Sequence, residues 1–230
     1  MIASRPQRSP RPKRAALLAL ATLLLAVSPA GACPSLDDFQ NGTAQGWMEG
    51  PGSPNPPINV PDGGPAGAGD AFLRNVASGD TGLAGGKQVM HNRLQWTGDL
   101  AACGLTAIEM DVANQGAIDL HVRVAVQGAL SQYGSAAAHV LPPDGVWRRV
   151  TFDLTAAGMA LIGGPDPLDD VLAAAVELRI LSAEAGPAWN GDLVASTLGV
   201  DNVRAVAPLG VREPAPLDRS WGAVKSRFSS

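Results

Sequence analysis

Two stretches of alternating apolar and polar residues lie near the middle of the chain. Every second residue is apolar over 107–112, and the same alternation returns over 118–126. Side chains on a β-strand point alternately to the two faces of its sheet, so each stretch places an apolar row on a core and a polar row outward. Residues 113–117 contain the Asn and Gly that are typical of strand connections. The pattern predicts two core strands of an antiparallel domain.

Shorter stretches of the same kind, separated by glycine, proline, asparagine and aspartate, occur along the rest of the chain. We expect strands at 36–39, 71–76, 87–91, 147–154, 176–180 and 198–203. Residues 50–69 are rich in proline and glycine, which predicts a long loop. An aspartate, prolines and early acidic residues at 165–170 predict a short helix over 168–173. The whole pattern predicts an all-β fold, a β-sandwich of two antiparallel sheets with one short helix.

The chain begins with a segment of different composition. Five basic residues lie within 5–14, residues 15–27 form an apolar run of Ala, Leu and Val interrupted only by Thr22, and Ala30-Gly31-Ala32 offers small residues to a signal peptidase. A helix that crosses a membrane needs about 20 apolar residues, which this segment does not reach. We therefore expect residues 1–32 to be a secretory signal peptide and residues 33–207 to form one domain. The protein is expected to be secreted, periplasmic or extracellular, with no transmembrane segment in the mature chain.

Removal of this leader changes the charge of the chain. It takes away five of the 17 basic residues and none of the 21 acidic ones, so 12 basic and 21 acidic residues remain, a net charge of −9. Nucleic acids and anionic membranes are bound mainly through Lys and Arg residues that neutralise phosphates. We therefore expect neither as a partner.

The two cysteines allow two interpretations. In an exported protein a pair of cysteines more often forms a disulfide than a metal site, and a bond between Cys33 and Cys103 would tie the mature amino terminus to the start of the first core strand. Alternatively, Cys33 is the lipid-modified first residue of a lipoprotein, because the sequence Ala30-Gly31-Ala32-Cys33 partly matches the lipoprotein cleavage box. The second interpretation leaves Cys103 as a free thiol.

The last part of the chain again differs in composition. From residue 208 onward, prolines stand among polar residues, as in a linker or tail. Within this part, Trp221, Val224, Lys225 and Phe228 have helical spacing. Residues 208–230 are therefore expected to be a Pro-rich tail with a short terminal helix.

Several short motifs occur in an order that resembles a known family. They are Asp38-Phe39, Gly46-Trp47, residues 67–73 (GAGDAFL), residues 95–99 (QWTGD), Asp119-Leu120 with Arg123, residues 144–147 (DGVW) and residues 200–203 (VDNV). In this order they look like the galactose-binding-like jelly rolls, which include many carbohydrate-binding modules and, more loosely, the laminin B type domain. The resemblance covers roughly residues 37–206. It implies a jelly roll of two packed antiparallel sheets that binds glycans or proteins without catalysis.

The resemblance also implies a structural calcium ion (Ca²⁺) where the first and last strands meet. The matching positions are Asp38 and Asp201. Calcium takes six to eight oxygen ligands, some of them backbone carbonyls, so two carboxylates are compatible with such a site. The alternative is that Asp201 ends a strand and Asp38 is solvated. If present, calcium is expected to lock the termini together and to take no part in chemistry.

Glycan binding needs aromatic faces on which a sugar ring can stack, with polar groups around them. The candidates for ligand binding are Tyr133, Trp189 and Trp96, of which Tyr133 and Trp189 stand in polar segments and are expected to be exposed. Trp47 follows Gly46, and Trp147 stands two residues after Gly145 at the start of the strand expected over 147–154; both are expected to be buried. Aromatic residues make up only 4% of the chain, so a structural role is the alternative for each of them.

The sequence offers little to support catalysis. His91, His121 and His139 lack metal-ligand spacing, and neither a nucleophile elbow nor a phosphate-binding loop occurs. A glycosidase needs two carboxylates across a cleft, and Glu109 and Asp111 are candidates that a solvated strand face explains as well. We expect a protein that is not an enzyme.

Three functions follow in decreasing order of expectation. The first is a non-catalytic binding module for an extracellular or cell-surface glycan. The second is a structural or adhesive envelope protein that contacts other proteins and no sugar. The third is a small jelly roll that cleaves glycosides.

Overall fold

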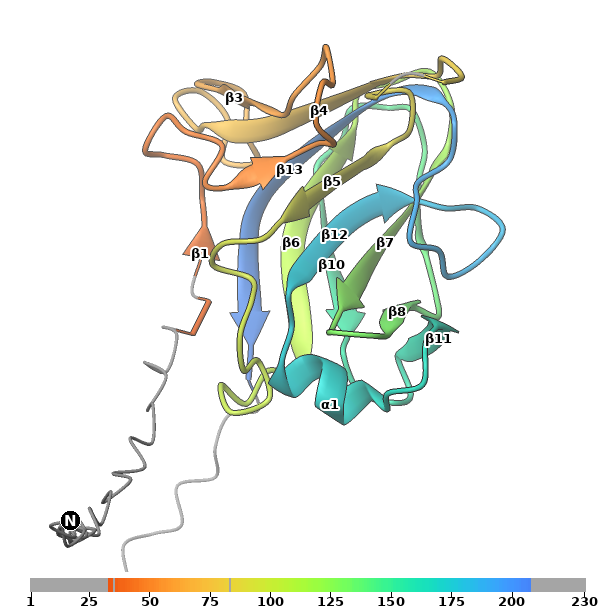
Figure 1. Cartoon of the computed structure of the whole chain (residues 1–230). Helices are drawn as coiled ribbons and strands as arrows, with labels where there is room; N and C mark the ends of the chain where they lie inside the picture. The colour runs from red at the N-terminus through yellow and green to blue at the C-terminus, as the bar shows by residue number, and fades with distance from the viewer. Residues whose placement is uncertain (1–32, 35, 83, 208–230) are drawn as a thin grey trace, which may run out of the picture.

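The chain forms a sandwich of two antiparallel sheets (Figure 1). The structure is a computed structural model and describes residues 33–34, 36–82 and 84–207. The predicted signal peptide (1–32) and the predicted Pro-rich tail with its terminal helix (208–230) lie outside the described residues. Within the described ranges, no helix has the length and apolar character needed to cross a bilayer.

Sheet A has the strand order β10-β6-β13-β4-β3, with β1 paired to β13 outside this path. Its strands are β1 (Leu36–Asp37), β3 (Ile58–Val60), β4 (Phe72–Ser78), β6 (Ala107–Asn114), β10 (Arg148–Asp153) and β13 (Ala195–Val206). Every pairing is antiparallel.

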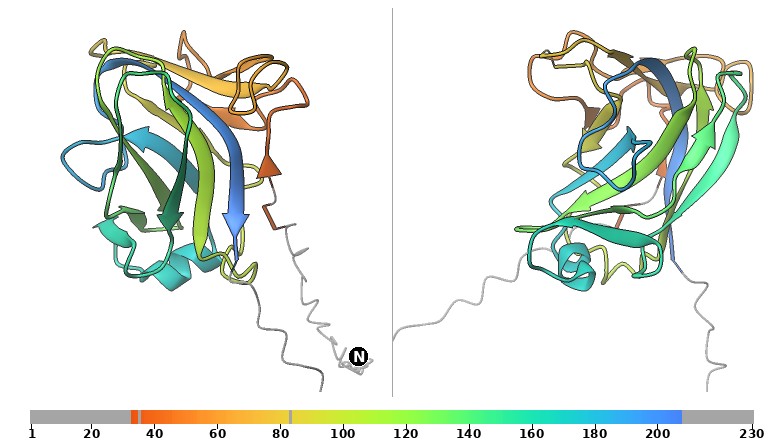
Figure 2. Two further views of the ribbon diagram at one scale, coloured as in Figure 1. Left: turned by 180° about the vertical axis from the view of Figure 1, so that it is seen from behind. Right: turned by 90° about the vertical axis from the view of Figure 1, so that its right-hand side faces the viewer.

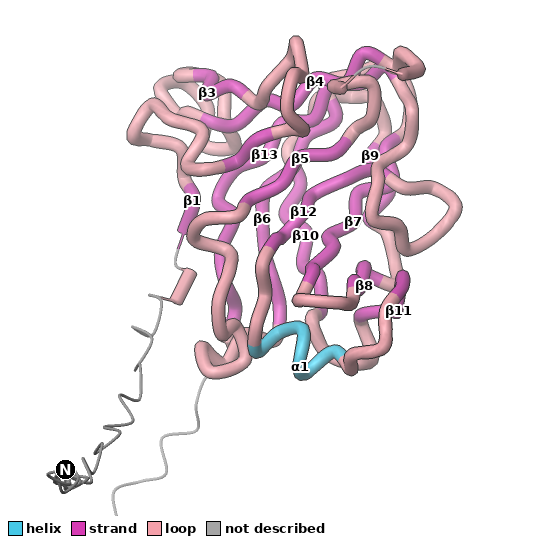
Figure 3. Tube along the Cα trace, in the orientation of Figure 1, coloured by secondary structure: helices cyan, strands magenta, loops and turns pink. Residues whose placement is uncertain are grey.

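Sheet B has the strand order β11-β8-β7-β12-β5-β2, with β9 paired to β7. Its strands are β2 (Trp47–Met48), β5 (Val89–Asn92), β7 (Leu120–Gln127), β8 (Gln132–Ser135), β9 (His139–Leu141), β11 (Met159–Gly163) and β12 (Glu177–Ser182). The helix α1 (Leu168–Ala173) lies at one end of the sandwich, as Figures 1 and 3 show.

One apolar core fills the space between the sheets. The alternating residues of the two central strands point into it and have no exposed surface: Ile108, Met110 and Val112 from β6, and Leu120, Val122 and Val124 from β7. The predicted alternation, the β-sandwich and the short helix over 168–173 are thereby confirmed. The strands β6 and β7 belong to different sheets, so the connection between them crosses from one layer to the other (Figure 2).

Two segments for which no strand is predicted contain short strands. The predicted loop over 50–69 contains β3, which pairs with β4, and the polar segment around Tyr133 contains β8. Strand β3 stands between Pro57 and Pro61 at the edge of its sheet, where the N–H that proline lacks is not needed for pairing. These strands, like β9 and β11, depend on a neighbour that is remote in sequence, so local composition does not indicate them.

A buried carboxylate joins the first strand to two indole rings. Asp37 is 4% exposed, and its Oδ2 accepts hydrogen bonds of 2.8 Å from Nε1 of both Trp47 and Trp96. Burial raises the pKa of Asp37, against the opposing effect of these hydrogen bonds. Because Trp47 belongs to β2 and Asp37 to β1, this cluster holds an edge strand of sheet B beside sheet A.

The two predicted buried tryptophans differ in the structure. Trp47 is 3% exposed, as expected. Trp147 is only half-buried, so that prediction was wrong: it packs edge-to-face on Phe72 with 5.2 Å between ring centroids, and its Nε1 donates to the carbonyl of Gly63. The ring also lies against Gly199, where a Cβ atom would come within 2.9 Å of it. The outer face of sheet A therefore carries this tryptophan.

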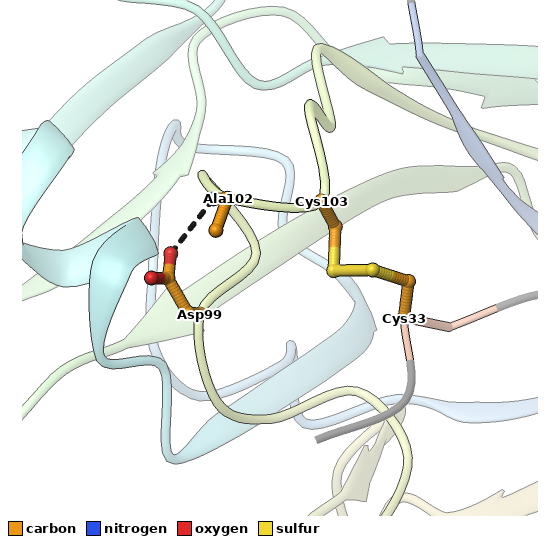
Figure 4. The surroundings of a disulfide bond; sticks show 4 residues. All are labelled: Cys33, Asp99, Ala102 and Cys103. Carbon is orange, nitrogen blue, oxygen red and sulfur yellow. Dashed lines mark hydrogen bonds between the residues drawn. A yellow bond between two sulfur atoms is a disulfide. The ribbon is translucent and has the colours of Figure 1, made fainter. Parts of the chain in front are cut away.

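The predicted disulfide is confirmed. Cys33 and Cys103 are bonded across a sequence separation of 70 residues (Figure 4). Cys103 lies in a turn that Asp99 stabilises, since its Oδ1 accepts a 2.8 Å hydrogen bond from the backbone N–H of Ala102. The structure contradicts the lipoprotein alternative, which requires the Cys33 sulfur for a lipid and leaves Cys103 free.

Loss of this disulfide should lower stability. We expect the double variant Cys33→Ser/Cys103→Ser to lose about 2–4 kcal/mol in the free energy of unfolding, because the crosslink no longer restricts the unfolded chain. Denaturant titration of both proteins measures the difference. Wild-type protein kept reduced with a thiol serves as the control and should match the double variant. Equal stability of oxidised and reduced wild-type protein would contradict this account.

Candidate functional site

The outer face of sheet B carries a row of polar side chains that crosses three strands. Met48 on β2 pairs with His91 on β5, and His91 pairs with Arg179 on β12. Arg93 follows His91 by two residues, so strand alternation places it on the same side. Glu177 precedes Arg179 by two residues and shares this face. Imidazole, guanidinium and carboxylate groups thus gather near one edge of the sheet.

A loop covers the middle of this face. The covering loop, residues 183–194, joins β12 to β13 and is the light-blue loop at the right of Figure 1. It forms a second apolar cluster on the sheet, made of the buried residues Ala125, Leu181 and Ala183 with Val89, Ile162, Ala188 and Trp189 packed against them. The outer row of β7 is therefore not solvated as the alternation alone suggests. Solvent reaches sheet B at the edge formed by β5 and β2.

Arg123 fixes the start of the covering loop. It is 7% exposed, its Nε donates to the carbonyl of Ala183, and its Nη1 donates to the carbonyls of Ser135 and Ala136. Burial lowers the pKa of Arg123, against the effect of Asp192. The buried guanidinium thus links β7 to the covering loop and to the chain after β8.

Glu177 is shared by two arginines. Its side chain is 2% exposed, Oε1 accepts from Nε of Arg179 at 2.5 Å, and Oε2 accepts from Nε of Arg93 at 2.6 Å. One buried negative charge therefore faces two positive charges. The arrangement leaves a net positive charge at this edge of sheet B.

Trp189 closes over Arg179. The guanidinium carbon lies 3.9 Å from the centroid of the indole ring, and Nη1 of Arg179 donates to the carbonyl of Trp189 at 2.8 Å. A guanidinium on an indole face gains from the negative potential of the ring. The stacking fixes both the direction of Arg179 and the position of the covering loop.

Next to this cluster lies a pocket of about 400 Å³, which we call the edge pocket. It is lined by residues from β2 and the turn after it (Met48, Glu49, Gly50, Pro51), from 84–87 (Ala84, Gly85, Gly86, Lys87), from β5 and just beyond (Val89, His91, Arg93), and by Arg179 and Asn190. Its volume falls within the range of about 300–1,000 Å³ typical of small-molecule sites. Of the titratable residues lining it, four are basic (Lys87, His91, Arg93, Arg179) and Glu49 is acidic.

Glu49 and Gly85 form one wall of the edge pocket. Glu49 is 8% exposed and its Oε2 accepts a 2.5 Å hydrogen bond from the Ser53 hydroxyl, while burial raises its pKa. Gly85 has φ +79°, and a Cβ there would lie 2.5 Å from the Ser53 Oγ and 3.2 Å from the Glu49 Oε2. Only glycine fits this conformation and this close approach.

His91 contributes a neutral ring to the edge pocket. It is 6% exposed. Burial lowers its pKa, and Arg93 and Arg179 lower it further, against the effect of Glu177. At neutral pH the imidazole is therefore uncharged, with one nitrogen that donates and one that accepts hydrogen bonds.

The structure does not bring the three predicted ligand-binding aromatics together. Trp96 is 0% exposed and its Nε1 is bound to Asp37, so the prediction for Trp96 was wrong, because its ring has no face open to a ligand. Tyr133 pairs with Val126, packs on the core from the inner side of β8, and donates its hydroxyl to the carbonyl of Asp166. Trp189 lies on the opposite, outer side and adjoins the edge pocket through Asn190.

The predicted calcium ligands lie in different surroundings. Asp201 is 0% exposed; burial raises its pKa to about 7, and the charges of Asp70, Asp111 and Asp38 raise it as well. Asp38 is half-buried and accepts a hydrogen bond from the N–H of Gln40. Among the described residues, no three or more His, Cys, Asp or Glu side chains form a group arranged to hold a metal ion.

Three oxygen atoms from Asp38 and the segment before β4 surround the side-chain amide of Gln40. Nε2 of Gln40 lies 3.1 Å from the Asp38 carbonyl, 2.8 Å from Oδ1 of Asp70 and 3.2 Å from the Ala71 carbonyl. An amide nitrogen has two hydrogens, so three acceptors around it exceed what it can satisfy. Calcium prefers carboxylate and carbonyl oxygens, and the oxygen atoms here are of these two kinds.

The carboxylates considered for glycoside cleavage are engaged in ion pairs. Asp111 accepts two 3.0 Å hydrogen bonds from Arg149, and Glu109 pairs with Arg204. Asp111 is only 5% exposed, so the expected solvated strand face is wrong at that position. Both residues lie on β6 of sheet A, away from the edge pocket.

Sequence reasoning missed the residues that form the edge pocket. Lys87 and Arg93 lie at and just beyond the ends of a predicted strand, and Glu177 and Arg179 lie within another. The signal was the alternation of 176–180, which places Glu177 and Arg179 side by side on one face. The partner strand that brings Arg93 and Lys87 to them could not be found from spacing alone.

Comparisons with known proteins give the fold. No protein-family model and no curated protein matches the chain. An exo-β-agarase aligns over 76% of this chain with 11% identity and a TM-score of 0.54, and a second agarase over 77% with 12% identity and a TM-score of 0.50. These likenesses show the fold, a jelly roll of two antiparallel sheets. The chain spans about a quarter of each agarase, 25% and 24% of their lengths.

A carbohydrate-binding module also aligns with the chain. The family 11 module from Clostridium thermocellum, solved with a β-1,3-1,4-mixed-linked tetrasaccharide, aligns over 76% of this chain and 95% of its own, with 14% identity and a TM-score of 0.49.

The ion cluster beneath the covering loop predicts a stability effect. We expect Glu177→Gln to lose about 2–4 kcal/mol in the free energy of unfolding, because two guanidinium groups then face each other without a buried carboxylate. Chemical denaturation measures the loss. The same substitution at the exposed Glu184 is the matched control and should change stability by less than about 0.5 kcal/mol. A loss at Glu177 no larger than at Glu184 would show that the shared carboxylate does not hold this face together.

Proposed function

We propose that the protein is an exported, non-catalytic binding module for an extracellular or cell-surface glycan, and that the edge pocket is its binding site. The observation that carries the proposal is the pocket itself. Its wall combines apolar side chains, Met48 and Val89, with hydrogen-bonding groups of His91, Arg93 and Asn190. A sugar offers the matching surface, since its ring has apolar C–H faces and a rim of hydroxyl groups.

Several donors in the pocket have no partner among the described residues. Arg93 uses its Nε on Glu177, and its terminal nitrogens make no hydrogen bond within the described chain. Arg179 uses Nε and Nη1 on Glu177 and the covering loop, which leaves Nη2. The ion pairs and the stacked indole hold these groups in place before a ligand arrives, which lowers the entropy that binding costs.

The disulfide supports the proposed export, and the shared fold supports the proposed binding of a glycan. Disulfides persist mainly in exported proteins, so the Cys33–Cys103 bond is compatible with the proposed secretion. The fold is also part of two agarases, enzymes named for a polysaccharide. In this proposal the described domain binds and performs no cleavage.

Thermal melts with a panel of soluble polysaccharides test this function. A ligand that binds only the folded protein stabilises it by about 2.7 kcal/mol at a concentration of about 100 times Kd. For a domain of this size, we expect the melting temperature to rise by about 5–10 °C with the matching glycan. The rival function, a structural or adhesive protein without a sugar ligand, predicts no shift with any glycan.

A blocking variant locates the site. Gly50 lines the edge pocket, and a Cβ added there meets no atom within 4 Å, so Gly50→Trp should fill the pocket and leave the fold intact. We expect it to abolish the glycan-dependent shift. Gly163→Trp is the matched control, since Gly163 on β11 also has open space around its Cβ and lies outside the pocket. Equal shifts in both variants would place glycan binding elsewhere.

We also propose that calcium binds near Asp38 and Asp201. The residues that would hold it are these two aspartates, with Asp70 and the carbonyls around the Gln40 amide. The ion would neutralise a group of carboxylates that raise the pKa of Asp201. Its contribution is structural, because it would join β1 to β13 and the segment before β4.

Calcium should therefore raise the melting temperature of the wild-type protein by several degrees relative to chelator, since it binds the folded state only. Asp201→Asn should lose this shift and, in chelator, should be at least as stable as wild type because it removes a buried, repelled charge. The exposed Asp80→Asn is the control and should keep the shift. If chelation changes nothing in the wild-type protein, calcium is excluded as a structural ion.

A further inference from the structure

The edge pocket has the charge of an anion site on an otherwise acidic protein. Three cationic side chains, Lys87, Arg93 and Arg179, line it beside the neutral His91, and the one acidic residue among its lining residues, Glu49, is buried and hydrogen-bonded to Ser53. The chain after residue 32 carries a net charge of −9, so polyanions are repelled from most of its surface. The positive charge of the pocket therefore comes from the side chains that line it and not from the overall charge of the protein.

The geometry points to a saccharide that carries an anionic group, a carboxylate or a sulfate. This inference rests on the proposed glycan-binding function and names the class of glycan. We propose that Arg93, Arg179 and Lys87 hold the anionic group, while Met48 and Val89 contact the sugar ring. A planar guanidinium with unused N–H groups pairs well with carboxylate and sulfate oxygens.

The ion cluster explains why the positive charge stays available. Glu177 neutralises one of the two arginines that share it, so one positive charge remains over the pair. The side chain of Arg93 is 58% exposed, so it reaches solvent at the pocket. Lys87 is exposed and makes no ion pair within the described residues, which adds a second positive charge to the pocket.

Neutral glycans do not require this arrangement. Hydroxyl groups are satisfied by neutral amides and by hydroxyl groups, and a buried carboxylate held between two guanidinium groups costs desolvation energy. An anionic group on the sugar recovers part of that cost, because each charge-assisted hydrogen bond is about twice as strong as a neutral one. The charge in the pocket therefore distinguishes acidic from neutral glycans.

Calorimetric titration of the protein with matched pairs of glycans tests the inference. Oligogalacturonate and its methyl ester share one backbone and differ in charge, and dextran sulfate and dextran form a second pair. We expect at least one acidic member to bind about tenfold or more tightly than its neutral partner, with an affinity that falls as salt is added. The pair that shows the preference identifies carboxylate or sulfate as the group bound.

Two charge-removing variants test whether the preference for acidic glycans arises at the edge pocket. Lys87→Gln removes a charge without breaking an ion pair, and we expect it to weaken binding of the acidic member by about fivefold to tenfold. Arg148→Gln removes the same charge from a half-buried arginine of β10 in sheet A, which is paired with Asp144, and should leave binding unchanged. A neutral member that binds as tightly as its acidic partner would overturn the inference and leave glycan binding in place.

The remaining outcomes are also decisive. If Lys87→Gln and Arg148→Gln weaken binding equally, the preference comes from overall charge and the inference fails. If neither these glycans nor the wider polysaccharide panel binds, the proposed function fails together with its refinement. Melts of each variant without ligand confirm that it is folded.

Discussion

The buried carboxylate of Glu177 is the constraint on which the candidate site depends. A charge removed from water needs compensation, and here Arg179 and Arg93 supply it from β12 and from the end of β5. The guanidinium of Arg179, held by Glu177, stacks on the indole of Trp189, and this contact positions the covering loop. That loop buries the middle of the outer face of sheet B. The edge where the edge pocket lies stays open.

A second buried carboxylate anchors the amino-terminal strand. Asp37 is buried and satisfied by the indole N–H groups of Trp47 and Trp96, which ties β1 of sheet A to β2 of sheet B. The disulfide adds a covalent restraint four residues before it. Strand β2, one wall of the edge pocket, is thereby held although it is only two residues long.

Much of this fold followed from the sequence, and most of the site did not. Alternation along β6, β7 and β10 and the proline-acid start of α1 are local signals, and the structure confirms them. Short strands such as β3 and β8 owe their pairing to distant neighbours, so composition made them appear as loops. The aromatic ring of Trp96 predicts a ligand residue because such rings stack on sugars, but its indole N–H donates to the buried Asp37 and the ring is enclosed in the core. Arg93 and Glu177 lie 84 residues apart in the chain, which no spacing rule could connect.

The central claim is that a glycan binds at the edge pocket, and mapping of backbone amide shifts by NMR tests it most directly. On addition of a bound oligosaccharide, the account predicts that the largest shifts fall on Gly50, Gly85, Lys87 and Asn190, which line the pocket from three separate segments. Shifts that instead gather around Trp147 and Phe72, on the outer face of sheet A, would contradict it.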